Sequence, residues 1–530
     1  MQSPLSPESG TTAVPGRIPR SGAPAQSRQQ AQSRQQAEGR WTRLVLAAIS
    51  LVAITVSIGL ISAVALLGPS AGVPRMPSAY PWPLFYLHAN PTARFVTWSL
   101  WLGVVAGAGG VTAGLLAVRR GWRPRPRLLI AGSLIAVLGM MLLPPIGSTD
   151  LLNDAVYGRI AALGHSPYRM TPKDFKATGD PIAALAVRHW ETYPSPYGPL
   201  MTVTQQVASD LAGDNGAKTM FWLKVWNALA FLAVALALDR MLRSDPAGRA
   251  RAHLLWTVNP LMLFAVMAGG HNDVLGVIFA VLAVAAVRRA DFISGLLAGV
   301  LAGAAIVMKA PFALIGLGLA IAAIRSPRAL AGLALGAAAV ALPTYEIAGK
   351  PAVTSVISES GRAFNTYQPW QLLARIAPSV GTLAGANELA IVVTVVLAAI
   401  LFWRMPSGPA EFPAVRPALV LTLAWLICSP SQRTWYDVMI FPLLALMPAT
   451  KLDWIALARG AVTLIAQLPA IGTATTGVRW LQNAGQDLNT VLVPAALAIL
   501  ALILVVLCLT GRIAPRRDRI RGAPRHAVPG

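Results

Sequence analysis

The chain has 530 residues, of which 55% are hydrophobic and only 12% are charged. Soluble domains carry about 25% charged residues, so this composition excludes an ordinary soluble protein and indicates that lipid is the solvent. The formal net charge of +23 comes largely from short arginine clusters between apolar runs. That distribution is typical of membrane loops and argues against nucleic-acid binding.

The N-terminal segment 1–38 is rich in Pro, Ser, Gln and Gly and has no apolar periodicity. We expect residues 1–40 to form a disordered cytoplasmic tail without a cleavable signal peptide. Residues 41–511 then form one transmembrane domain, and residues 512–530 form a basic cytoplasmic tail.

Apolar runs along the transmembrane domain predict an all-α, polytopic helical bundle with about 14 spans. The predicted spans are 43–68, 94–118, 128–146, 218–239, 252–269, 273–287, 292–308, 311–324, 329–346, 388–403, 416–429, 436–449, 454–472 and 490–510. The two cysteines, Cys428 and Cys508, lie inside apolar runs and are interpreted as small buried hydrophobes.

Arginine clusters predict the orientation of these spans, because cytoplasmic loops are enriched in Lys and Arg. Every second loop is basic, and both ends of the chain fall on the basic side. Both termini are therefore predicted to be cytoplasmic. The largest outward loops are 147–217 and 347–387, and the first is long enough to hold amphipathic helices on the membrane surface.

The first large outward loop carries two acids, Asp150 and Asp154, just beyond an apolar run. A carboxylate at that depth is costly unless it is paired or faces a wet cavity, so Asp150 is a candidate general base or cation ligand. The alternative is a solvated acid or one that stabilises a helix N-terminus. The four-residue spacing would place both acids on one helical face.

Two further outward turns combine polar and aromatic residues. Tyr197 and Gly198 lie between two prolines, a rigid turn that presents a ring either to a sugar or to the membrane interface. His271, Asn272 and Asp273 follow an apolar run. They are suited to a phosphate or a hydroxyl-rich ligand, although Asn and Asp also favour plain turns.

Two cations also fall at outward ends of predicted spans. Lys309 ends an apolar run, where it either contacts a lipid phosphate or snorkels to the interface. Arg433 lies beside Gln432 and next to the aromatic pair Trp435 and Tyr436, and an arginine can bind phosphate bidentately. Trp370 is a further aromatic candidate in the second large outward loop.

These placements together predict one outward cavity for an anionic lipid head and a polar acceptor. ATP is absent outside the cell, and the sequence has no glycine-rich phosphate loop. A membrane-dissolved activated donor would therefore supply the energy. We predict no cofactor and assign no metal ligands, and assistance by a divalent cation, with Asp273 as a ligand, stays open.

Motifs from about residue 140 to 450 resemble those of the GT-C superfamily, in particular the actinobacterial polyprenol-phosphomannose-dependent α-(1→6)-mannopyranosyltransferases. The likeness rests on Ser148-x-Asp150, Gly158-Arg159, Gly164-x-x-Pro167-Tyr168, Pro196-Tyr197-Gly198-Pro199, Asn259-Pro260, His271-Asn272-Asp273, Lys309 and Trp435-Tyr436. The family pattern usually has a tyrosine soon after the aspartate, where this chain has Leu151, Leu152 and Asn153.

The resemblance implies a GT-C-type bundle in the plasma membrane that transfers mannose from polyprenyl-phosphomannose, with inversion, to a mannan or lipoglycan acceptor outside the cell. Asp150 would be the base. The candidates for donor binding are Asp154, Arg159, His271, Asn272, Asp273, Lys309 and Arg433, and the acceptor or aromatic candidates are Tyr168, Tyr197, Trp370, Gln432, Trp435 and Tyr436. The alternatives are a GT-C enzyme with another donor such as arabinose, or a lipid or polysaccharide transporter.

Overall fold

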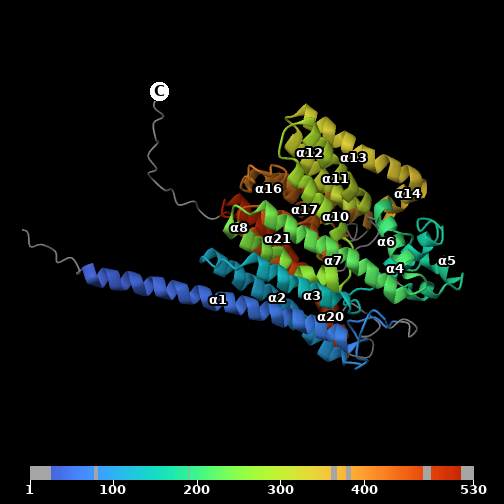
Figure 1. Ribbon diagram of the computed structural model, residues 1–530, viewed down its shortest axis with the longest axis horizontal. Coiled ribbons are helices and arrows are strands. Elements are labelled where there is room, and N and C mark those ends of the chain that lie inside the picture. The colour runs from blue at the N-terminus through green and yellow to red at the C-terminus, as the bar shows by residue number, and fades with distance from the viewer. Residues whose placement is uncertain are drawn as a thin grey trace, which may run out of the picture.

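The computed structural model describes residues 25–76, 82–188, 190–359, 367–377, 383–468 and 479–514, and these contain helices and loops but no strand. The predicted all-α fold is therefore confirmed across this part of the chain (Figure 1).

The helices of the first part are α1 (Ala25–Leu67), α2 (Ala93–Arg119), α3 (Pro126–Met141), α4 (Asp150–Ala162), α5 (Pro172–Lys176), η1 (Pro181–Leu185), α6 (Pro199–Ala212) and α7 (Gly216–Met241). The middle part contains α8 (Pro246–Ala252), η2 (His253–Thr257), α9 (Pro260–Leu263), η3 (Phe264–Ala268), α10 (Val274–Ala286), α11 (Phe292–Met308), η4 (Ala310–Phe312), α12 (Ala313–Ala323), α13 (Pro327–Ala348) and α14 (Lys350–Glu359). The last part contains α15 (Trp370–Ile376), α16 (Leu383–Arg404), α17 (Val415–Cys428), η6 (Thr434–Met439), α18 (Phe441–Leu446), α19 (Leu452–Gln467), α20 (Arg479–Asp487), η7 (Leu488–Leu492) and α21 (Val493–Leu509).

Six helical stretches among the described residues are long and apolar enough to cross a bilayer. They are Glu38–Leu67, Ala93–Arg119, Gly216–Met241, Pro327–Ala348, Gly385–Arg404 and Gln482–Leu509. The remaining apolar helices have 10–17 residues. At about 1.5 Å per residue, all of these are shorter than the roughly 30 Å hydrocarbon layer. The count of about 14 spans stays a prediction.

Proline and capping side chains decide where many of these helices begin. Pro126, Pro199 and Pro327 each occupy the first turn of a helix, where the missing N–H costs nothing. The side chain of Asn215 accepts a hydrogen bond from the backbone of α7, and that of Asp291 accepts one from the backbone of α11.

Two segments differ from their predictions. The first helix begins at Ala25, although residues 25–40 were expected in the disordered tail. Its Ala, Gln and Arg residues are good helix formers, and they extend an existing helix without a new nucleation step. The predicted span 252–269 is a broken helix of two π turns and a short α turn, because Asn259 caps a new helix that begins at Pro260.

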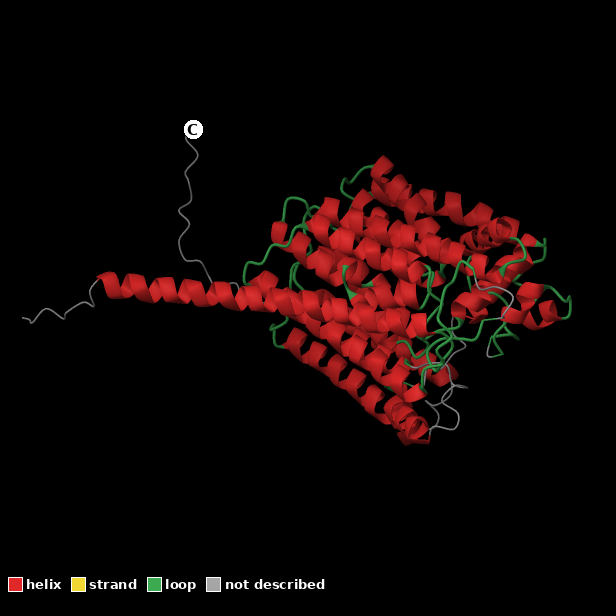
Figure 2. Cartoon of the chain, turned by 60° about the horizontal axis from the view of Figure 1, so that its bottom comes forward, coloured by secondary structure: helices red, strands yellow, loops and turns green. Residues whose placement is uncertain are grey.

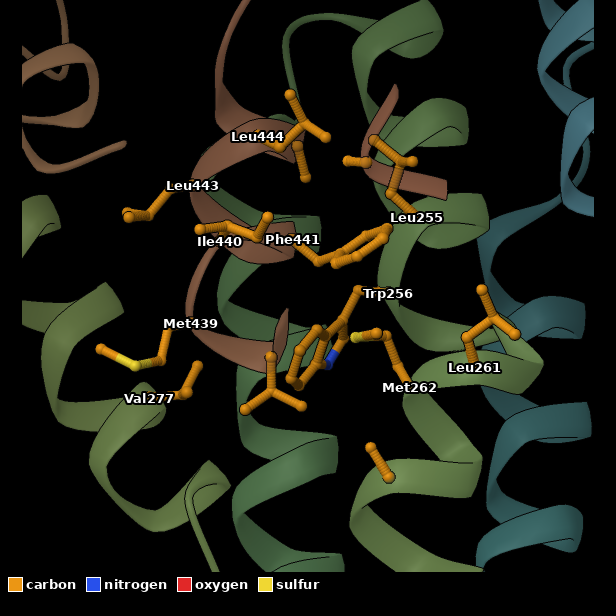
Figure 3. Packing of buried hydrophobic residues seen from close by; sticks show 14 of the residues in the cluster. Leu255, Trp256, Leu261, Met262, Val277, Met439, Ile440, Phe441, Leu443 and Leu444 are labelled. Atoms are coloured by element: carbon orange, nitrogen blue, oxygen red, sulfur yellow. The ribbon is translucent and has the colours of Figure 1, made fainter. Parts of the chain in front are cut away.

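The broken segment lies in the centre of the bundle, where it packs against η6 and α18 (Figure 3). The Trp256 indole is fully buried, stacks on Phe231 at 4.9 Å and donates a hydrogen bond to its carbonyl at 3.1 Å. Arg251 forms a buried ion pair with Asp453 at 2.5 Å. These contacts fix α8 and η2 against α7 and α19, and thereby fix the turn that follows η3.

The segment 147–217 folds as α4, α5, η1 and α6, with an apolar cluster of its own. It lies at one end of the bundle (Figure 1). The sequence suggested surface helices here, but most of α4 is buried because α6 and α7 pack against it. Gly158 permits this approach, since a Cβ there would lie 2.3 Å from the Gln205 carbonyl oxygen.

Both described ends of the chain lie at the end of the bundle opposite α4 (Figure 2). Basic loops contact one another there. Arg119 donates to the Thr450 carbonyl at 3.3 Å, and the Lys451 amide donates to the Ile513 carbonyl at 3.0 Å. Loops that the arginine pattern assigned to one side therefore lie together, remote from α4.

Candidate active site

Asp150 begins α4 and is positioned by the turn before it. Gly147 adopts a positive φ of 68°, which favours glycine, and its amide donates to the Gly72 carbonyl at 2.7 Å. The Ser148 hydroxyl then accepts a hydrogen bond from the Asp150 amide at 3.2 Å. The carboxyl group therefore belongs to the first residue of α4. Two hydrogen bonds fix the backbone at the start of this helix.

The Asp150 carboxyl faces His271 and Trp190. One carboxyl oxygen lies 3.6 Å from His271 Nδ1, and the Trp190 side chain is hydrogen-bonded to the carboxyl. The imidazole stacks on Trp435 with ring centroids 3.7 Å apart and a 12° angle between planes. With 17% of its side chain exposed, Asp150 is half-buried in a polar site and keeps a face open to a ligand.

Asp154 lies one turn further along α4 in a more closed environment. It is 2% exposed, and its two oxygens accept hydrogen bonds from Gln205 at 3.1 Å and from Asn272 at 3.0 Å. The Tyr197 side chain is also hydrogen-bonded to it. Asp154 therefore holds three elements of the site together, whereas Asp150 has an accessible face.

Lys309 supplies a buried cation at the end of α11. Its ammonium lies 2.7 Å from an Asp273 carboxyl oxygen, and the side chains are 11% and 1% exposed. The ammonium also lies 5.4 Å from the centre of the Tyr197 ring and 4.7 Å from that of Tyr436, within cation–π range.

Arg433 contributes a second cation, with its guanidinium carbon 5.4 Å from the centre of the Trp190 ring. Among the described residues, Trp190 thus contacts both the Asp150 carboxyl and this guanidinium.

The charges of the site act on one another. Burial raises the pKa of Asp150 above that of an ordinary carboxyl, and the positive charges of Arg433 and Lys309 oppose the shift. Burial and then repulsion from Asp150 raise the pKa of Asp154 well above its usual range. Burial and the same two cations lower the pKa of His271 well below its usual value, so its imidazole is neutral at physiological pH.

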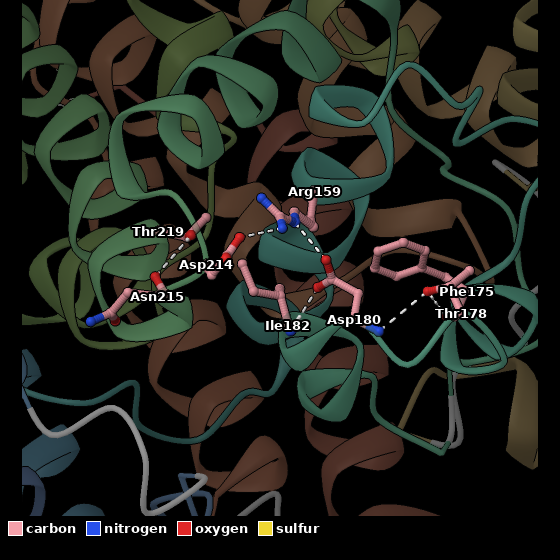
Figure 4. A network of polar contacts seen from close by, with 8 residues as sticks. All are labelled: Arg159, Phe175, Thr178, Asp180, Ile182, Asp214, Asn215 and Thr219. Atoms are coloured by element: carbon pink, nitrogen blue, oxygen red, sulfur yellow. Dashed lines mark hydrogen bonds and ion pairs between the residues drawn. The ribbon is translucent and has the colours of Figure 1, made fainter.

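Four predicted site residues form polar contacts with residues other than Asp150, His271 and Lys309. Arg159 pairs with Asp180 at 2.8 Å and with Asp214, nine residues along α4 from Asp150 (Figure 4). The Tyr168 hydroxyl bonds the Thr202 hydroxyl at 2.7 Å. Trp370 donates to the Cys428 carbonyl at 2.7 Å, and the Gln432 side-chain oxygen accepts from Arg459 at 2.8 Å. These side chains brace the surrounding elements.

Three polar residues of the structure were not singled out from the sequence. Gln205 reaches Asp154 from α6, and Trp190 contacts Asp150. Lys224 is fully buried within α7, where it donates to the carbonyls of Met140 and Leu143 just before the Asp150 loop. A lysine inside an apolar span is a detectable signal, because such residues are rare and usually have a role. Gln205 and Trp190 carried no comparable signal.

The described residues contain no group of three or more His, Cys, Asp or Glu side chains that could hold a metal ion. The acids of the site instead contact amides, a lysine and aromatic rings.

An acid, a neutral histidine and two cations at one end of a helical bundle define a polytopic membrane protein with an enzyme-like polar site. The chain belongs to the family described as alpha-(1→6)-mannopyranosyltransferase, N-terminal domain, whose model matches residues 56–325. That range includes Asp150, His271 and Lys309, whereas Arg433 lies beyond it.

Curated relatives carry the same activity in their names. The probable alpha-(1→6)-mannopyranosyltransferase of Mycolicibacterium smegmatis is 31% identical over 140 residues, 26% of this chain and 24% of the relative. The alpha-(1→6)-mannopyranosyltransferase of Mycobacterium tuberculosis is 26% identical over 141 residues, with the same shares. Alpha-(1→6)-mannopyranosyltransferase B of Corynebacterium glutamicum is 24% identical over 137 residues, 26% of this chain and 23% of the relative. The chain thus matches about a quarter of the length of each of these relatives.

Proposed function

We propose that the chain is an integral-membrane glycosyltransferase that moves mannose from polyprenyl-phosphomannose to an α-(1→6)-mannan or lipoglycan acceptor. The observation that carries this proposal is the accessible carboxylate of Asp150, held close to two cations in a buried polar site. Family membership supports the mannosyl part of the proposal.

Asp150 is the general base of the proposed reaction. Its carboxylate takes the proton of the acceptor hydroxyl as the acceptor oxygen bonds to the anomeric carbon of mannose. The bond from that carbon to the phosphate oxygen breaks, and polyprenyl phosphate leaves with the electron pair. A single displacement inverts the anomeric carbon, so a β-linked donor gives an α-linked product. The pKa raised by burial makes the carboxylate a stronger base than an exposed aspartate.

Asp154 is less suited to this role, because both of its oxygens already accept hydrogen bonds from amide groups. With 2% of the residue exposed, the carboxyl also leaves little room for an acceptor hydroxyl to approach. We assign Asp154 as a positioning residue that fixes Asn272 and Gln205 beside α4.

Lys309 and Arg433 stabilise the leaving phosphate in this scheme. The positive charges of both side chains act on the Asp150 carboxyl, which supports placing a phosphate bound beside that carboxyl under their influence. The neutral imidazole of His271 can donate a hydrogen bond to a phosphate oxygen without adding charge. Preorganised donors and cations of this kind stabilise developing negative charge.

Aromatic rings supply the proposed surface for sugars. Trp190, Trp435, Tyr197 and Tyr436 all contact either His271, Asp150 or Lys309. Ring faces suit the C–H surfaces of sugar rings, and the arrangement leaves polar groups for the hydroxyls.

We further propose that this end of the bundle faces outward from the plasma membrane and that both termini are cytoplasmic. The support is the collection of basic loops at the other end, which is the expected composition of the cytoplasmic side.

The proposal is tested with the full chain in proteoliposomes, radiolabelled polyprenyl-phosphomannose and an α-1,6-oligomannoside. Asp150→Asn should reduce transfer by about 1,000-fold, in the range expected for a lost general base. Asp210→Asn is the matched control, because Asp210 is exposed on α6, and it should transfer normally. Digestion of the product with α-specific mannosidase reports inversion. Undiminished transfer by Asp150→Asn, or a β-linked product, would refute the assignment.

A further inference from the structure

A cavity of about 450 Å³ opens at the basic end of the bundle, away from the candidate active site. It is lined by Arg240, Met241, Arg243, Ser244, Arg288 and Glu411. These residues come from the end of α7, the turn between α10 and α11, and the loop between α16 and α17. Three segments that are distant in sequence therefore build one basic cavity.

The three arginines of the cavity form no ion pair among the described residues. No carboxylate of the described residues forms an ion pair with Arg240, Arg243 or Arg288, although Glu411 lines the same cavity. The lining thus carries three positive charges and one negative charge.

The two acids that flank Arg240 and Arg243 in the sequence form no ion pair with them. Asp239 binds Arg249 through two contacts of 2.6 Å and His253 at 2.9 Å. Asp245 accepts a hydrogen bond from the backbone amide of Ala247. Asp239 is therefore engaged elsewhere, and Asp245 forms no ion pair with Arg240 or Arg243, so the cavity lining keeps a net positive charge.

One guanidinium is also oriented by an aromatic ring. Arg288 lies 4.6 Å from the centre of the buried Phe412 ring, which limits the directions in which its N–H groups can point. The Ser244 hydroxyl adds a neutral donor to the lining. A guanidinium group can donate two hydrogen bonds to two phosphate oxygens, and a hydroxyl can donate one to a further oxygen.

The position of the cavity at the end of α7 suits contact with lipid headgroups. Arg240 is in the last turn of α7, one of the helices long enough to cross a bilayer. Its end therefore lies near the membrane interface, and basic pockets between helices at this level bind anionic headgroups. The volume is in the usual range for small-ligand sites, about 300–1,000 Å³.

We propose that this cavity binds a phosphate-bearing anion, with the headgroup of an anionic phospholipid as its source. The site is separate from the proposed mannosyl-transfer site, and its occupancy does not depend on that reaction. An alternative source with the same chemistry is free phosphate.

Titration of phosphatidylglycerol into the full-length protein in neutral detergent, followed by native mass spectrometry, tests the proposal. The variant Arg240→Gln/Arg243→Gln/Arg288→Gln should bind this lipid about 100-fold more weakly, since each basic residue near an anionic headgroup contributes roughly fivefold. Phosphatidylcholine should show no such difference between wild type and variant.

The matched control is Arg289→Gln/Arg325→Gln/Arg328→Gln, which removes three exposed charges from residues outside the cavity lining. It should bind phosphatidylglycerol within about threefold of the wild type, because solvent and salt screen more distant charges. Asp150→Asn should bind the lipid normally, which separates this site from the proposed function.

Competition with excess inorganic phosphate distinguishes the two sources. Phosphate that binds alone and is lost only in the cavity variant would assign the site to the free ion. Equal losses in the two triple variants, or equal binding of phosphatidylglycerol and phosphatidylcholine with no binding of phosphate, would overturn the proposal.

Discussion

The two ends of this molecule use charge in opposite ways. At the α4 end, Lys309 and Asp273 are nearly buried and paired, and the cations lie against aromatic rings. At the basic end, Arg240, Arg243 and Arg288 are exposed and lack a partner carboxylate among the described residues. The first arrangement creates a low-dielectric site where charges act strongly on one another, and the second offers screened positive charge to a membrane surface.

The difference shows that the number of charged residues in a loop does not predict whether they form buried ion pairs or remain solvated. A buried charge requires a specific partner, because removing it from water costs several kcal/mol. An exposed charge stays solvated and needs no specific partner. Such charges act together, through the field that they create, to attract anions. Variants of the two classes should therefore behave differently in stability measurements.

The largest effect on folding is expected from Lys309→Met, which leaves Asp273 buried without its ion-pair partner. We expect the free energy of unfolding to fall by about 3–5 kcal/mol, with near-complete loss of transfer. Lys350→Met, at an exposed lysine of α14, should change neither. The double variant Lys309→Met/Asp273→Asn should recover most of the stability but little activity, as measured by thermal denaturation in detergent and by the transfer assay. Equal stability losses in the single and double variants would show that the pair is not the source of the effect.

A smaller effect is expected from His271, whose pKa is lowered well below its ordinary value by burial, Lys309 and Arg433. The unfolded chain then binds a proton below about pH 6.5 that the folded chain does not bind. The stability of the wild type should therefore fall by about 1.4 kcal/mol per pH unit below pH 6.5 because of this group, until the native pKa is reached.

His271→Phe keeps a ring that can stack on Trp435 and removes this titration. The stability difference between wild type and variant should rise with pH up to about 6.5 and then remain constant. Thermal denaturation over a pH series measures it. A difference that is constant with pH would contradict a neutral, buried histidine.

The smallest effect on activity is expected from Arg159, which pairs with Asp180 and Asp214 away from Asp150. Arg159→Gln should lower the free energy of unfolding by roughly 1–3 kcal/mol, because it leaves the partly buried Asp180 without its charged partner. Its transfer rate should stay within about threefold of wild type. A loss of transfer comparable with that of Asp150→Asn, at unchanged stability, would return Arg159 to the donor-binding residues.

The sequence predicted those features that follow from composition and periodicity. Apolar runs predicted the helices. The alternation of arginine clusters predicted that the loops around Arg119, Arg240 and Lys451 share one end of the bundle. Asp150, His271, Lys309 and Trp435 were proposed for one cavity, and the structure places them in contact or close to one another.

Features that depend on packing could not be predicted. Gln205 lies in an ordinary helical pattern, and it reaches Asp154 only because Gly158 allows α6 to approach α4. Arg159 follows Gly158 in the sequence, and only the folded chain reveals its partners. Within 252–269 the apolar run is continuous enough to predict one helix, and the break follows from the local backbone at Asn259 and Pro260.

The most direct test of the account measures transfer as a function of the side that receives the acceptor. Sealed proteoliposomes contain labelled polyprenyl-phosphomannose in the bilayer, and a membrane-impermeant oligomannoside is placed on one side only. Orientation is read with an impermeant thiol reagent at Ser244→Cys, which marks the basic end, in a variant whose buried Cys428 and Cys508 are replaced. We predict mannosylated product only when the acceptor is on the side opposite to residue 244. Product formed with the acceptor on the same side as residue 244 would contradict the placement of the active site around Asp150.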